Sequence, residues 1–451
     1  MSRCLFILIL TTVGWSVSGQ AQERQVTFDP SGHDLDNNDN FSADNQWLCF
    51  DARETDGPGI EECTSIGKVH IETGEIIELY RPTDVQFGDE PAPGIGAVSY
   101  NRTVDEVAFI HGPLVSQVGE RGAYGKPNRN GARIAADGRG ELKWLDFRDV
   151  SKDRETLPGA HRGGTHRHEY TWDGTRIGFT YDDFLMPKYD RTVGYMEARS
   201  DAPQGASHYV AMLVPVVPKG TSKPGELEKA WGDSWVGKDG RMRAFIGKVR
   251  NDDGETYEQS LFVVDVPTSV DIASANSGSG RRFPTPPSGI SIRRLTSSWA
   301  EGIVRGSLDG ERIAYYGKAT DGTTQVFVIP SDGSQEGKQV TEFPEGTEHG
   351  LRWHPSGNSI FTISDMGVAT ACVKPGTFFG KTQFLTNHGT GAERTKLAIS
   401  WDGAMLAFNR QVPMVEKDGT LLKNYAGEDY VQIFVLPFPD QDSDGIADGL
   451  D

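Results

Sequence analysis

One short unit recurs along the whole sequence and restricts the fold more than any other feature. Each copy has a polar turn, often Asp-Gly, then β-branched or apolar residues, and then a small residue before an aromatic one. A strand, a tight turn and a second strand produce this pattern. The seven turns are centred on Asp44, Thr103, Asp173, Asp239, Asp309, Ser356 and Asp402. Because a repeat of about 45 residues with short strands is typical of a propeller blade, the sequence predicts an all-β, seven-bladed β-propeller.

A second pattern predicts how the ring closes. Residues 294–296, 338–341 and 383–386 resemble one another, as the outer strand that completes a blade would. Residues 24–27 share this pattern but precede every blade, whereas the last blade ends at 431–436 with only three strands. We therefore expect residues 24–28 to supply the fourth strand of the last blade, which leaves no open sheet edge.

The two ends of the sequence differ from the repeats between them. Residues 1–21 have a positive start, an apolar segment and small residues before a cleavage point, which indicates a secretory signal peptide. The alternative is a buried first strand. No later apolar run is long enough to span a membrane. We expect an exported protein, periplasmic or extracellular, with a propeller at 22–438 and an acidic tail at 439–451. Export permits a disulfide between Cys49 and Cys63, although two free buried thiols fit the sequence equally well.

The acidic tail has the ligand spacing of a calcium-binding loop. Carboxylates occupy positions 1, 3, 5, 9 and 12, and Gly445 stands at position 6, where such loops turn sharply. The expected calcium ligands are Asp440, Asp442, Asp444, Asp448 and Asp451. The stretch resembles a single loop of the thrombospondin type 3 or dockerin kind. A disordered acidic tail is the alternative.

The formal net charge of −19 limits the choice of partner. Such a surface repels phosphate backbones, so nucleic acid is not expected as a ligand. The same charge opposes polyanionic substrates unless cations gather locally around the site.

Four histidines are predicted to meet at one face of blades 2 and 3. His166 and His168 begin the first strand of blade 3, and alternate strand residues share a face. His111 ends the second strand of blade 2, and His208 precedes the third strand of blade 3. Imidazoles in such a group can hold a divalent transition metal, such as manganese or zinc. Alternatively, these histidines satisfy buried backbone groups or line a wet channel.

The predicted mouth of the central channel is polar. Counting back from each turn gives Asn37, Gly96, His166, Gly232, Gly302, His349 and Thr395 as the residues of the mouth. A packed core would favour larger apolar residues at these places. An open polar concavity is therefore expected, and ligands commonly bind in concavities.

Several short motifs occur in the order found in a bacterial family. The chain resembles TolB-like propellers over residues 24–438, and more closely a TolB-like family with no assigned function. The motifs that carry the resemblance are Gln25 to Phe28, Phe109 to Pro113, Gly163 to His168, Ser207-His208 and Trp353 to Gly357. This resemblance implies a fold but no activity.

A more distant likeness connects the His166-Arg167-His168 stretch to oligogalacturonide lyases, propellers in which histidines hold a metal. That likeness implies a metal-dependent lyase acting on acidic oligosaccharides, although Gly163 stands where those enzymes have a glutamine ligand. The candidates for a substrate clamp or a base are then Arg162, Arg167, Tyr170 and Tyr209. The alternative function is a non-catalytic propeller that docks a protein or a glycan.

Overall fold

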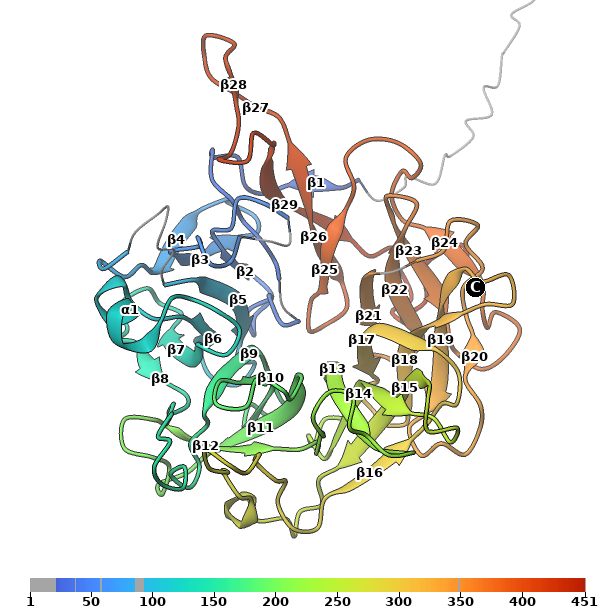
Figure 1. Ribbon diagram of the computed structural model, residues 1–451. Helices are drawn as coiled ribbons and strands as arrows, with labels where there is room; N and C mark the ends of the chain where they lie inside the picture. Colours follow the sequence, from blue (N-terminus) through green and yellow to red (C-terminus); the bar gives the residue numbers. More distant parts are fainter. Residues whose placement is uncertain (1–21, 37, 57–58, 86–92, 348, 451) are drawn as a thin grey trace, which may run out of the picture.

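Seven β-sheets stand around a common axis as the blades of a ring (Figure 1). The computed structural model describes residues 22–36, 38–56, 59–85, 93–347 and 349–450. The predicted signal peptide and Asp451 lie outside these residues. The prediction of an all-β, seven-bladed propeller is confirmed.

Most blades have four antiparallel strands that run outward in chain order. Blade 1 has three, β2 (Trp47–Asp51), β3 (Ile66–His70) and β4 (Ile76–Tyr80). Blade 2 comprises β5 (Ile95–Tyr100), β6 (Glu106–His111), β7 (Asn130–Ala135) and β8 (Lys143–Trp144). Blade 3 comprises β9 (Gly163–Tyr170), β10 (Arg176–Asp183), β11 (Thr192–Ala198) and β12 (His208–Met212). Blade 4 comprises β13 (Leu227–Val236), β14 (Met242–Arg250), β15 (Tyr257–Asp265) and β16 (Ser291–Arg294).

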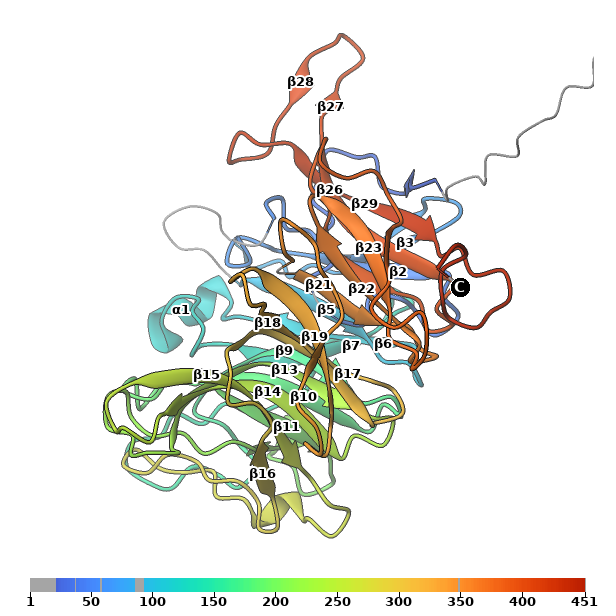
Figure 2. The same ribbon diagram turned by 90° about the vertical axis from the view of Figure 1, so that its right-hand side faces the viewer.

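The remaining blades follow the same plan. Blade 5 comprises β17 (Ala300–Gly306), β18 (Arg312–Lys318), β19 (Thr324–Pro330) and β20 (Lys338–Gln339). Blade 6 comprises β21 (His349–Trp353), β22 (Ser359–Ser364), β23 (Gly367–Cys372) and β24 (Thr382–Phe384). Blade 7 comprises β25 (Thr395–Ile399), β26 (Met405–Val412), β29 (Tyr430–Pro437) and β1 (Arg24–Gln25). A small hairpin, β27 (Met414–Val415) and β28 (Leu421–Leu422), projects from blade 7 (Figure 2).

The N-terminal strand closes the ring as predicted. Arg24 pairs with Val435 and Gln25 with Phe434, so β1 forms the outer edge of blade 7. Val26 continues the contact by donating its N–H to the Ile433 carbonyl at 2.8 Å. Because the first and last strands share a sheet, the ring has no unpaired end at the join.

The aromatic residue that ends each repeat unit forms the core between blades. Five of these residues, Phe109, Phe179, Phe245, Phe361 and Phe408, are fully buried. Each belongs to a second strand, where alternation turns one side chain in two toward the neighbouring blade. The repeat pattern therefore records the packing between blades.

The part of the chain that the structure describes has little helix and no disulfide. One α-helix, α1 (Val115–Arg121), and one 3-10 turn, η1 (Ile272–Ser274), lie in connecting segments. Neither is long and apolar enough to cross a membrane. Cys49 and Cys63 are buried free thiols, so of the two possibilities for this pair the structure shows the unpaired one.

Candidate binding site in the central channel

The innermost strands share a bulge near the channel mouth. In blades 2 to 7 the pairing of the first strand with the second shifts register at the same level. One residue of each bulge has a left-handed backbone, namely Ala97, Arg167, Gly232, Gly302, Gly350 and Lys396. Glycine adopts this conformation readily, whereas other residues adopt it at a cost in free energy. Residues strained in this way are often found at functional sites. Two of the costly positions, Arg167 and Lys396, carry positive charge.

The bulge at Arg167 changes the direction of the predicted histidine pair. His166 pairs with Thr180, and its Nε2 lies 2.8 Å from the Thr180 hydroxyl and 3.2 Å from an Asp182 carboxylate oxygen. His168 comes after the bulge, so the alternation of a regular strand no longer applies to the pair. The prediction that His166 and His168 point the same way is therefore wrong.

His168 turns instead toward blade 2. Its Nε2 lies 3.1 Å from the Thr165 hydroxyl, which in turn donates to Asp146. Gly131 of blade 2 leaves room for the ring, because a Cβ atom built there would lie 2.7 Å from that nitrogen. His168 thus belongs to a buried polar contact between blades 2 and 3.

The two remaining histidines have neighbours of their own. The Nδ1 of His111 lies 2.6 Å from the Gly112 carbonyl oxygen, and its Nε2 lies 3.2 Å from the Tyr80 hydroxyl. The Nδ1 of His208 lies 2.9 Å from the Ser207 hydroxyl. Within the described chain, the acidic tail has three side chains whose ligating atoms lie within 4.8 Å of one another. The four histidines do not form such a group. As arranged, the four histidines do not fit a single metal ion.

Burial keeps these rings neutral, which predicts a pH effect on stability. Burial lowers the pKa of His111, His168 and His208 to about 4. At pH values between the folded pKa near 4 and the unfolded pKa near 6.5, each of these histidines is protonated in the unfolded chain but neutral in the folded chain. The free energy of unfolding therefore falls as the pH falls through this range.

The variant His208→Gln removes one such ring. When the pH falls from 7 to 5.5, the free energy of unfolding of this variant should rise by about 1 kcal/mol relative to that of the wild type. Urea denaturation at the two pH values measures the change. An unchanged difference between variant and wild type would contradict a neutral buried His208.

The four residues expected to clamp substrate or act as a base are separated in the structure. Arg162 is fully buried and bonded to Asp183 and to the Arg282 carbonyl. Tyr209 is buried in the outer strand of blade 3. Tyr170 is buried against blade 2 and donates to Glu106 at 3.2 Å. Of the four, Arg167 is the one whose side chain lies at the channel mouth.

The mouth holds a cavity of about 420 Å³ with charged walls. Asp36 is the centre of its ion pairs, because Arg167 and Lys396 reach one carboxylate oxygen at 2.8 and 3.1 Å, and Arg53 reaches the other at 3.1 Å. Burial opposes ionisation of Asp36, but these three cations hold its pKa well below the usual range. The bulges therefore aim both Arg167 and Lys396 at one carboxylate.

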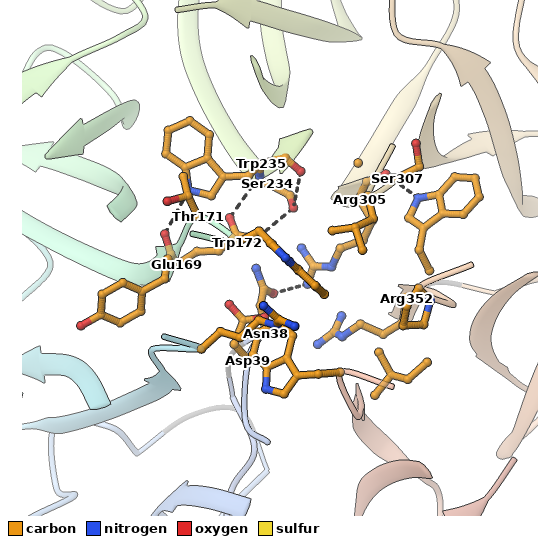
Figure 3. Close-up of a pocket in the computed structure, with 18 of the residues that line it drawn as sticks. Asn38, Asp39, Glu169, Thr171, Trp172, Ser234, Trp235, Arg305, Ser307 and Arg352 are labelled. Atoms are coloured by element: carbon orange, nitrogen blue, oxygen red, sulfur yellow. Dashed lines mark hydrogen bonds between the residues drawn. The ribbon is translucent and has the colours of Figure 1, made fainter. Parts of the chain in front are cut away.

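Two further arginines line the channel below this network. Arg305 of β17 and Arg352 of β21 border both the mouth cavity and a second, lower cavity. Their side chains point into the channel (Figure 3), where Arg305 donates to Asn38. The Nε of Arg305 is buried and has no hydrogen-bond partner among the described residues. Burial lowers the pKa of both groups, and Arg305 lowers that of Arg352 further.

The lower cavity, of about 150 Å³, has aromatic rings as well as charged groups in its walls. Its walls include Trp172, Trp235, Trp353 and Trp401 from four different blades. The last three donate their indole N–H to backbone carbonyls of Glu169, Arg305 and Phe41, respectively. Because these indole N–H groups are already bonded, the rings offer the cavity mainly apolar surface.

The acidic tail is folded onto the ring near blades 6 and 7. Ile446, Ala447 and Leu450 are buried in the apolar cluster of those blades. Carboxylate oxygens of Asp440, Asp442 and Asp444 lie within 4.8 Å of one another. Gly445 has φ 81°, the left-handed turn that the loop spacing requires. Asp448 instead accepts a bond from the Gln441 N–H at 3.0 Å.

Comparison by sequence relates the chain to a family and to one curated protein. Residues 94–211 match the model of a family described as a protein of unknown function (DUF3748). The uncharacterized protein YidR of Escherichia coli (strain K12) is 28% identical in an alignment 416 positions long, which covers 85% of this chain and 94% of that protein. The chain is similar to this family of unknown function. The matched residues form blades 2 and 3 and include all four histidines.

Solved structures are similar to the chain in fold. An oligogalacturonate lyase in complex with manganese matches 94% of this chain and 95% of its own, with 11% identity and a TM-score of 0.52. TolB from Acinetobacter baumannii matches 88% of this chain and 84% of its own, with 12% identity and a TM-score of 0.39. The resemblance to a family without assigned function, inferred from the short motifs, is confirmed, and the lyase match supports the propeller fold.

Arg305 and Arg352 were not among the site residues predicted from the sequence. Arg305 and Arg352 each follow the bulge glycine of their own repeat, Gly302 and Gly350, within three residues. An arginine inside the innermost strand of two consecutive blades is the signal that could have shown them.

Proposed function

We propose that this chain is an exported propeller that binds a carboxylate-bearing oligosaccharide in its central channel. The observation that carries the proposal is the Arg305 and Arg352 pair, which lines both cavities. Guanidinium groups match the planar geometry of a carboxylate and can donate two parallel hydrogen bonds to it. An anion beside the pair would relieve the repulsion that lowers the pKa of Arg352.

The charge of the whole protein makes this concentration of cations more significant. With a net charge of −19, the surface repels anions, whereas cations outnumber carboxylates at the mouth cavity, whose lining holds Arg167, Arg305, Arg352 and Lys396 against Asp36, Asp56 and Glu393. Cations gathered in a cleft focus the local potential and attract an anion that the remaining surface would repel. The aromatic walls below then offer apolar surface to a sugar ring.

Calorimetric titration with trigalacturonate tests the proposal. We expect saturable binding, and at least tenfold weaker binding of the fully methyl-esterified trimer, because the ester removes the charge while keeping the shape. Equal affinities for the acid and the ester, or no heat from either, would overturn the proposal. Amino-terminal sequencing of the periplasmic fraction tests export, for which a mature chain starting near residue 22 is expected.

A metal-dependent lyase is a separate proposal from the sequence. The four histidines as arranged do not fit one ion, so their geometry gives no support to a catalytic step through a metal. Metal analysis of the purified chain, with absorbance measurements for unsaturated products during the titration, tests it. A stoichiometric transition metal that is lost in His166→Ala, together with product formation, would support the lyase over simple binding. A protein-docking ring is the outcome left if neither saccharide binding nor turnover occurs.

We also propose that the acidic tail binds calcium. The support is the ligand spacing together with the gathered oxygens of Asp440, Asp442 and Asp444. A lone loop is expected to bind in the millimolar range. At ten times the dissociation constant, calcium should then stabilise the full chain by about 1.4 kcal/mol.

Thermal unfolding of the full chain with and without calcium measures this effect. Asp442→Asn should abolish the stabilisation, and Asp418→Asn, in the exposed hairpin loop, is the matched control. A wild-type melting temperature that does not respond to about 20 mM calcium would contradict the site.

A further inference from the structure

One acidic side chain of the channel has no role in the ion pairs described above. Asp39 lines the lower cavity directly after Asn38, the residue that accepts from Arg305. None of the hydrogen bonds drawn between the lining residues in Figure 3 reaches the Asp39 carboxylate. By contrast, Glu169, the other carboxylate of this cavity, is bonded to Ser234 and to Arg243.

The surroundings of Asp39 set its charge near neutral pH. Burial opposes its ionised form most strongly, and the pKa of Asp39 rises to about 7 as a result. Glu169 of β9 opposes ionisation as well, whereas Arg352 of β21, Arg305 of β17 and Arg243 of β14 favour it. The carboxyl group thus changes its charge near pH 7 at the wall of the cavity that Arg305 and Arg352 also line.

An anion bound by Arg305 and Arg352 would compete with an ionised Asp39 for the same cations. Two carboxylates that share one site do not both remain ionised, because their mutual repulsion raises the pKa of one of them. The protonated carboxyl then has an O–H that can donate to the bound anion. Because Asp39 lines the same cavity as Arg305 and Arg352, we infer that the channel takes up one proton with its anionic ligand, and that Asp39 is the residue that receives it.

This inference rests on the proposed function, since it names the residue that adjusts the same site to its ligand. It also restricts the ligand. A carboxylate accepts a hydrogen bond from Asp39 and remains ionised well above pH 4, whereas an organic cation would favour ionised Asp39 and release a proton. Binding that weakens as the pH rises therefore indicates an anionic ligand, and binding that strengthens indicates a cationic one.

Calorimetry with trigalacturonate in buffers of different ionisation enthalpy measures the proton uptake directly. The wild-type chain should take up close to one proton at pH 8, and its affinity should fall about tenfold per pH unit from pH 7.5 to 8.5. Asp39→Asn cannot bind the proton but keeps the shape of the side chain, so its affinity should stay constant over this range.

Asp34→Asn is the matched control. Burial raises the pKa of Asp34 to about 7 as well, but Asp34 does not border either cavity. This variant should keep the pH dependence of the wild type. Should Asp39→Asn fail to fold, the proton uptake of the wild-type chain still decides the question.

The possible outcomes separate this inference from the function on which it rests. Saturable binding without proton uptake, or an unchanged pH dependence in Asp39→Asn, would overturn the role of Asp39 and leave the channel site intact. Absence of trigalacturonate binding at every pH would overturn the proposed function itself.

Discussion

Replacing Arg305 with methionine is expected to weaken trigalacturonate binding by about 100-fold. The side chain lies at the junction of the two cavities and is 7% exposed, so water can replace its hydrogen bonds only poorly. Removing one partner from a buried, charged hydrogen-bonded pair typically costs about 2 kcal/mol or more, and each 1.4 kcal/mol corresponds to about tenfold in affinity. Calorimetric titration of the variant against the wild type measures the loss.

Two further variants separate charge from geometry. Arg305→Lys keeps the charge but cannot donate two parallel bonds, so an intermediate loss of about tenfold is expected. Arg281→Met removes an exposed arginine outside the channel and should leave the affinity unchanged. If Arg305→Met binds like the wild type while its fold is intact, the channel does not hold the carboxylate.

The fold could be predicted from the sequence because its repeat records the packing of the blades. The aromatic residue at the end of each unit is buried between blades, and Arg24 and Gln25 pair where the outer-strand pattern placed them. Both features are local patterns of alternation and turn residues, which fix the register of short strands.

The site was harder to predict, because it depends on a break in that alternation. At Gly232, Gly302 and Gly350 the bulge has a sequence signal, since glycine favours a left-handed backbone. At Arg167 and Lys396 the bulge has no such signal, because these residues rarely adopt a left-handed backbone. Here the conformation occurs together with ion pairs to Asp36, which is distant in the sequence. A one-residue shift reverses the side chains that follow, and the predicted histidine pair was therefore separated.

The buried network around Arg243 provides the second large effect, this time on stability. Arg243 is 1% exposed and donates to Asp233 at 2.6 Å and to Glu169 at 2.8 Å, which joins blades 3 and 4 beneath the channel. Arg243→Met leaves two carboxylates close together without their shared cation. Breaking a buried pair from one side typically costs about 3–5 kcal/mol, because an uncompensated charge remains inside the protein.

We therefore expect the free energy of unfolding of Arg243→Met to fall by about 3–5 kcal/mol. Arg241→Met, two residues earlier, removes an exposed arginine that pairs with Asp239 at 3.2 Å, and should cost less than about 1 kcal/mol. Urea denaturation of both variants at pH 8 makes the comparison. An equal, small effect of both substitutions would show that Glu169 and Asp233 do not depend on Arg243 and that other contacts hold blades 3 and 4 together.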